Sequence, residues 1–365
     1  MFKTLIFGIF TASIVLMANA TVATERLQLD ESVVKVDDRT TQTKNAALQQ
    51  ALRDVILKNS GSESALDVAS INSAISNPTS YIRQFGYQDI EGQQYLRASF
   101  DQQKIIKLLR DAQLPVWGKQ RPLTLMWLAD HNQGEFNIVS DASDTVVSGD
   151  IRQISQSRGM PMLLPLMDLD DAMFVGVNDV RGMFADQVAK ASQRYNTDYF
   201  IMASVEINSD NKASFNMVLY PMGTEQGLYQ PLAQKSGVAD TETAAIGQML
   251  SAVSEFYAAR YAVADSGESL SKKLTFIDLS QRKQLVDIEK FLTQLSAVKS
   301  VSLIQLKGST ASFSLELFGS EADLKRLLNL ESKVKQQIVL QPNVDQSDPL
   351  APSQTEVVNY IWLGQ

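Results

Sequence analysis

The sequence predicts an α+β protein of three small domains, the middle one α/β-like. Two observations predict this class. Strands and helices follow in the order β-α-β-β-α near both ends of the chain, and apolar strands alternate with helices in between. The 365 residues, 44% hydrophobic and 20% charged, have the composition of a globular protein with buried cores. Loop-forming residues at 115–122 and 265–269 separate the regions, so we expect domains at 21–118, 119–265 and 270–365.

The first twenty residues predict export. Lys3 precedes an apolar run, residues 5–17, and Ala18-Asn19-Ala20 then places small residues at both positions that a signal peptidase requires. This pattern predicts a signal peptide over residues 1–20, cleaved after Ala20; a buried N-terminal helix is the alternative. The run is shorter than the roughly 20 residues that span a bilayer, so we expect no transmembrane segment. Without cysteine there is no lipid anchor, and we expect a soluble protein of the Gram-negative periplasm.

The N-terminal domain is expected to hold an amphipathic helix and a small sheet. Apolar residues fall on one helical stripe over residues 45–60, and Gly61 is a typical helix stop. Gly92 lies in a short hairpin turn, and Asp101 can cap a second helix that continues through 105–109. The expected strands are residues 32–36, 81–90 and 94–100.

The middle domain is expected to contain a mixed sheet flanked by helices. Residues 123–129 and 160–167 are nearly continuous apolar runs, as in strands that are covered on both faces. Two further strands, 199–207 and 213–220, form a hairpin. The expected helices are residues 145–157, 180–195 and 241–261.

The C-terminal domain repeats the β-α-β-β-α order. Ser320 and Asp323 have the spacing of a capping box, which opens the last helix. Either an internal duplication or two independent α+β units would produce the repeated order. Residues 342–352 are expected to form a loop. The remaining expected elements are strands 273–277, 301–306, 311–318 and 357–363, and a helix at 280–295.

Composition excludes several classes of function. Lys and Arg number 33 against 41 for Asp and Glu, so the formal charge of −8 argues against nucleic-acid binding. No cysteine and a single histidine, His131, leave no ligands for zinc fingers, HExxH metalloproteases or iron–sulfur clusters. No phosphate loop or dinucleotide fingerprint occurs. We therefore expect no cofactor and no metal, and the sequence favours a non-catalytic protein over an enzyme.

Five polar residues are candidates for ligand binding. Asp168, Asp170 and Asp171 follow one expected strand, and Asp130 and His131 follow another. Ligands of open α/β sheets bind at the carboxyl edge, and carboxylates suit hard cations. The alternative is a solvated or helix-capping role, because acidic residues commonly begin helices. No residue is assigned a catalytic or metal-binding role.

Three short strings match those of penicillin-recognising enzymes: residues 32–35, 209–211 and 235–237. Their context does not fit. Ser32 lies in an expected strand, whereas such a nucleophile opens a helix, and Asp210 lies in an expected hairpin turn. We interpret the three matches as coincidence.

The signal peptide, the apolar run from Met162 that ends in Asp168, and the Ala- and Leu-rich helix that runs into Ser60-Gly61 give the chain a family resemblance. It resembles a catalogued proteobacterial family of exported envelope proteins of unknown function. The order of elements in the middle domain is similar to that in periplasmic assembly factors: the N-terminal domain of the Tol-system propeller protein, outer-membrane activators of penicillin-binding proteins, and the flagellar assembly protein T. This resemblance implies envelope proteins as partners. The alternative is a periplasmic enzyme or ligand-binding protein that uses Asp130, His131 and Asp168.

Overall fold

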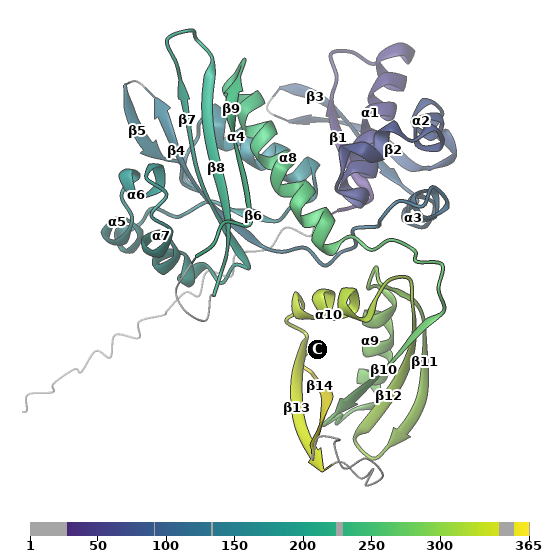
Figure 1. The fold of residues 1–365 in the computed structure, drawn as a ribbon. Helices are drawn as coiled ribbons and strands as arrows, with labels where there is room; N and C mark the ends of the chain where they lie inside the picture. Colours follow the sequence, from purple (N-terminus) through teal and green to yellow (C-terminus); the bar gives the residue numbers. More distant parts are fainter. Residues whose placement is uncertain (1–27, 91, 133, 224–228, 343–353, 365) are drawn as a thin grey trace, which may run out of the picture.

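The computed structural model describes residues 28–90, 92–132, 134–223, 229–342 and 354–364, which form three sheets with helices packed on them (Figure 1). The α+β class is confirmed. The expected signal peptide and residues 343–352 of the expected loop lie outside the described residues. Within the described residues, no helix combines the length and the apolar character needed to cross a membrane.

The N-terminal unit is a three-stranded antiparallel sheet with helices on one face. The strands β1 (Glu31–Lys35), β2 (Ile82–Ile90) and β3 (Gln93–Phe100) have the order β1-β3-β2. Helices α1 (Thr41–Ser60) and α3 (Gln102–Asp111) lie where the sequence predicts them, and Asp101 caps α3. The sequence did not predict α2 (Ala69–Ser76), η1 (Glu63–Asp67) or η2 (Pro78–Ser80), which are short and rich in polar residues.

The middle unit is a mixed sheet with helices on both faces. The order is β5-β4-β7-β8-β9, with β6 also beside β4, and β4 runs parallel to β6 and β7. Helices α4 (Val146–Ser157) and α8 (Glu242–Tyr261) cover one face, and α5 (Leu169–Phe174), α6 (Val177–Arg181) and α7 (Ala185–Ser192) cover the other (Figure 1). The strands are β4 (Thr124–Asn132), β5 (Glu135–Ile138), β6 (Met162–Leu163), β7 (Tyr199–Ile207), β8 (Ala213–Pro221) and β9 (Ala233–Ala239).

Two predictions in this unit were wrong in extent. The run 160–167 is a strand only at β6, because Pro161 and Pro165 cannot donate to a ladder. The helix expected at 180–195 is broken into α6, α7 and a 3-10 turn, η3 (Gln193–Tyr195). The break falls after Gly182, where Met183 has a left-handed φ of 56°.

The C-terminal unit is a five-stranded sheet of order β11-β12-β10-β14-β13. The predicted β-α-β-β-α order is confirmed, and Ser320 and Asp323 form the expected capping box of α10 (Glu321–Asn329). The sequence did not predict β13 (Val334–Pro342), in which polar and apolar residues do not alternate. The other elements are β10 (Leu270–Ile277), α9 (Arg282–Thr293), β11 (Val298–Lys307), β12 (Thr310–Leu317) and β14 (Gln354–Trp362).

Buried contacts join the three units. One hydrophobic core continues from the middle sheet through Tyr257 and Tyr261 of α8 to Phe276 of the C-terminal sheet. At the end of α1, the buried guanidinium of Arg121 lies over the ring of Trp117 at 3.6 Å. The same guanidinium donates to backbone carbonyls from both sides of the junction: Lys58, Trp117, Gly118 and Gly159. The N-terminal and middle units are therefore linked through groups that water does not reach.

Candidate functional site

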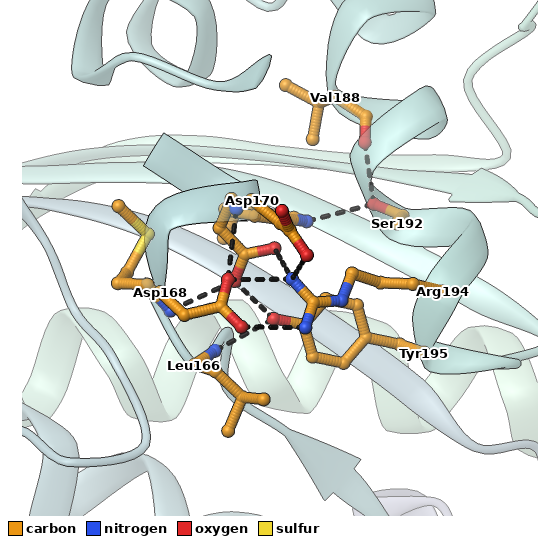
Figure 2. A network of polar contacts seen from close by, with 10 residues as sticks. Leu166, Asp168, Asp170, Val188, Ser192, Arg194 and Tyr195 are labelled. Atoms are coloured by element: carbon orange, nitrogen blue, oxygen red, sulfur yellow. Dashed lines mark hydrogen bonds and ion pairs between the residues drawn. The ribbon is translucent and has the colours of Figure 1, made fainter. Parts of the chain in front are cut away.

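Three of the five candidate residues lie together at the start of α5. Asp168 is the N-cap of this helix and accepts a hydrogen bond from the backbone N–H of Asp171 at 3.1 Å. Arg194, in η3, donates to both carboxylate oxygens of Asp168 at 2.7 Å each and to Asp171 at 3.2 Å. Asp170 lies farther from the same guanidinium, at 3.9 Å (Figure 2).

The side chain of Asp171 has no exposed surface and is fully partnered. Besides Arg194, its carboxylate accepts hydrogen bonds from the backbone N–H of Met167, at 2.9 Å, and from the hydroxyl of Tyr195. The Tyr195 oxygen in turn accepts from the N–H of Leu166 at 2.8 Å. We refer to Asp168, Asp171, Arg194 and Tyr195 as the clamp, because together they fix the loop before α5 to the end of α7.

The sheet positions the basic half of the clamp. On β4, the Nε1 of Trp127 donates to the hydroxyl of Ser192 at 2.9 Å, and this hydroxyl donates to the carbonyl of Val188 at 2.7 Å (Figure 2). The ring of Tyr195 also packs edge-on against Trp127. These contacts hold the end of α7 on the sheet, and Arg194 follows two residues after Ser192.

Within the clamp, the pair of Asp168 and Arg194 is ionised at neutral pH. Hydrogen bonds from Arg194 lower the pKa of Asp168 to about 2, and the same pairing raises the pKa of Arg194. Burial, then the hydrogen bond to Asp171, raises the pKa of Tyr195, so that its hydroxyl stays protonated and can donate. The carboxylates thus already have cationic and hydrogen-bonding partners. In the part of the chain that the structure describes, no three His, Asp or Glu residues are grouped to hold a metal ion.

Asp130 and His131 do not join this group. Side chains alternate along β4, and Asp130 follows Met126 and Leu128 on the face covered by α4 and α8. There it is buried, its Oδ1 accepts no hydrogen bond from the described residues, and burial raises its pKa. His131 projects from the opposite face, where its ring packs at a tilt against that of Phe136, with 4.7 Å between the ring centroids. The structure therefore separates two residues that are adjacent in the sequence.

The residues of the penicillin-enzyme strings are also apart. Ser32, on β1, donates to Asp54 of α1 at 2.7 Å in the N-terminal unit. Asp210 lies in the β7–β8 turn and Lys235 on β9, both in the middle unit. Two surface hollows, of about 360 Å³ and about 140 Å³, lie in the C-terminal and N-terminal units and contain none of the candidate residues.

The apolar side chains of α5 point to solvent. The only buried residue of this helix is Asp171, whereas Leu169 is 76% exposed and Met173 is 70% exposed. Three neighbouring apolar residues are each more than half exposed, and we define the α5 face as Leu166, Leu169, Met173, Phe174 and Phe184.

The α5 face lies on the side of the middle sheet away from the N-terminal unit (Figure 1). The clamp explains its orientation, because Arg194 and Tyr195 hold the acidic side of α5 against the protein. Sequence reasoning found the three aspartates but missed Arg194, Tyr195 and the apolar residues of α5. No local signal marks this surface, because apolar residues one helical turn apart, such as Leu169 and Met173, ordinarily predict a buried face.

Comparisons with known proteins find similarity in two regions of the chain, one towards each end. Residues 23–118 match the family model of a domain of unknown function, DUF8605, and residues 270–358 match another, DUF2066. No curated protein matches the chain. Among solved structures, a formyltetrahydrofolate deformylase from Pseudomonas putida KT2440 aligns over 54% of this chain and 90% of its own, at 12% identity. The TM-score of 0.17 is too low to support any inference. The chain thus carries two regions similar to domain families of unknown function, one before and one after the middle unit.

Proposed function

We propose that this chain is an exported, non-catalytic protein that acts in protein–protein interaction or assembly in the periplasm, and that the α5 face is its binding surface. The signal-peptide pattern over residues 1–20 supports export. The observation that carries the proposal is the orientation of α5, with Asp171 inside and Leu169 and Met173 outside.

This orientation opposes the ordinary preference of the residues. A short helix with two apolar residues one turn apart normally buries them, at a gain of about 2 kcal/mol for each large side chain. Here an ion-pair and hydrogen-bond network buries a carboxylate instead. A group of large exposed apolar residues close together in the chain is typical of a site that a partner covers.

The same contacts argue against catalysis at the candidate residues. Asp168 and Asp171 are committed to Arg194, and Asp130 lies on the other face of the sheet. A general acid or base needs a free oxygen within reach of a substrate. The geometry thus favours a structural role for these carboxylates and a binding role for the surface that they orient.

Site-specific photo-crosslinking in cells tests the proposal. A photoreactive amino acid would replace Met173 in the full chain and, as a control, Val286, a half-exposed apolar residue of α9. We expect a discrete adduct in the periplasmic fraction from position 173 only, and its loss when Leu169→Asp is added. Identical adducts at both positions, or no adduct at 173, would contradict a binding role for the α5 face. Retention of the chain in the cytoplasm would contradict export.

A further inference from the structure

We infer that the α5 face binds an α-helix of a partner protein whose apolar stripe is flanked by lysine or arginine. This inference rests on the proposed function and adds the chemistry of the partner. It is drawn from the kind of elements that build the face and from the charges at its rim.

The face is made by helices, not by a strand edge. Helix α5 packs beside α7, and the side-chain amide of Gln187 donates to the carbonyl of Phe174 at 2.9 Å. Leu169 and Met173 are one helical turn apart, and Phe174 and Phe184 extend the surface towards α7. No free backbone ladder is available here for strand addition. Recognition therefore depends on side chains, and a partner helix with apolar residues at one-turn spacing matches this surface.

The rim of the face is acidic. Asp170 is 74% exposed, and Asp186 is exposed in the first turn of α7. Two nearby arginines make contacts within the protein. Arg194 is paired with Asp168, and Arg181 lies over the ring of Phe136 at 3.5 Å.

Arg181 and Lys190 are exposed as well, but residues 166–195 hold five aspartates against three cations, so the charge around the α5 face is negative. Complementary charge favours a basic partner, and basic residues beside an apolar stripe would meet Asp170 and Asp186. A second copy of this chain would bring the same acidic rim against itself, because a twofold interface uses one surface twice. The charge pattern thus favours a different, basic protein.

Binding of designed helical peptides to the full chain, followed by fluorescence anisotropy, tests the inference. The probe is an amphipathic peptide of about 18 residues with leucines at one-turn spacing and lysines along both flanks. A matched peptide has glutamates at the flanks. We expect the lysine peptide to bind at least about tenfold more tightly, and added salt to weaken its binding.

Variants assign the binding to the face. The double variant Leu169→Gln, Met173→Gln should weaken binding of the lysine peptide by about tenfold or more. The variant Asp170→Asn, Asp186→Asn should weaken it less and reduce its dependence on salt. Val286→Gln is the matched control on another unit, and we expect it to leave binding unchanged.

Three results would overturn the inference: equal binding of the two peptides, no binding of either, or unchanged binding after Leu169→Gln, Met173→Gln. Sedimentation showing a dimer that the same substitutions dissociate would assign the face to a second copy instead. An adduct at Met173 in cells without peptide binding would leave the proposed function standing and reject the basic helix. If neither the adduct nor peptide binding were observed, the proposed function and the inference of a basic helix would both be rejected.

Discussion

Arg194 and Asp168 are joined by two parallel hydrogen bonds of 2.7 Å each, the forked geometry of strong guanidinium–carboxylate pairs. The same guanidinium reaches Asp171, whose side chain has no exposed surface. We expect Arg194→Gln to lower the free energy of unfolding by about 2 kcal/mol, because it leaves a buried carboxylate short of a donor. Arg194→Lys should retain only part of this free energy, since an ammonium group cannot donate two parallel hydrogen bonds to one carboxylate. Urea denaturation followed by tryptophan fluorescence measures both.

A matched control for this prediction is the exposed pair Lys107 and Asp111, with side chains 74% and 61% exposed. Lys107→Gln should change the free energy of unfolding by less than about 0.5 kcal/mol. If Arg194→Gln were no more destabilising than Lys107→Gln, the clamp would not hold α5.

The pH dependence of the clamp follows from Asp168. Its pKa in the folded protein is lowered from 3.8 to about 2 by the hydrogen bonds from Arg194. A carboxyl whose pKa is depressed on folding stabilises the protein above its unfolded pKa, and this stabilisation is lost as the pH falls through the folded pKa. We therefore expect the stability difference between the wild type and Asp168→Asn to shrink from about pH 4 to about pH 2. An NMR titration of the Asp168 carboxyl carbon with a midpoint near 3.8 would contradict this.

The elements that the sequence predicts well are those with local start and stop signals. Helix α1 ends at Gly61, which adopts the left-handed conformation of a C-cap, and α3 begins at Asp101, whose side chain caps it. The strand expected over residues 160–167 was predicted from its apolar residues alone. That pattern ignores the missing backbone N–H groups of Pro161 and Pro165. Strand β13 was missed because its polar and apolar residues come in consecutive runs and do not alternate.

The site could be predicted only in part. Asp168, Asp170 and Asp171 were predictable as a group, because they are adjacent in sequence. Their pairing with Arg194, 26 residues beyond Asp168, depends on how α7 packs against the sheet, which no local pattern encodes. The spacing of apolar residues in α5 would ordinarily predict a buried face, and the tertiary contacts of the clamp reverse it.

Asp130 offers a stabilising substitution. It is buried, its Oδ1 accepts no hydrogen bond from the described residues, and burial raises its pKa. A raised folded pKa means that the charged form opposes folding, so stability is lost as the pH rises through that pKa. We expect Asp130→Asn to raise the free energy of unfolding at neutral pH by about 1 kcal/mol, and the gain to vanish in acid.

Thermal unfolding at two pH values measures the effect of Asp130→Asn. Asp210→Asn is the control, because Asp210 is exposed in the β7–β8 turn and its neutralisation should change the free energy of unfolding by less than about 0.5 kcal/mol. If Asp130→Asn lowered the free energy of unfolding, the carboxylate of Asp130 would have a partner. The face of the sheet covered by α4 and α8 would then again be a candidate ligand site.

Gly61 is required by both conformation and space. Its φ is 74°, and an added Cβ would lie 2.5 Å from the Cβ of Ala258 and 2.7 Å from the ring of Trp117. We expect Gly61→Ala to cost about 3 kcal/mol, the sum of left-handed strain and overpacking. Gly92→Ala separates the two effects, because its φ is 78° with no atom within 4 Å of the added Cβ. Gly92→Ala should lower the free energy of unfolding by only about 1 kcal/mol. If chemical denaturation gave equal losses for Gly61→Ala and Gly92→Ala, the space around Gly61 would not be tight.

Arg121 is predicted to couple the unfolding of the N-terminal and middle units. It donates to the carbonyls of Lys58 and Gly159, which lie on opposite sides of the junction, and no carboxylate pairs with it among the described residues. Arg121→Met keeps the apolar contact with Trp117 but leaves these carbonyls without a donor. We expect a loss of about 3 kcal/mol and, in calorimetry, a single transition resolving into two as the units unfold separately. Arg53→Met, on the same helix as Lys58 but outside the junction hydrogen bonds, should preserve one transition. A single, unshifted transition in Arg121→Met would show that this guanidinium does not couple the two units.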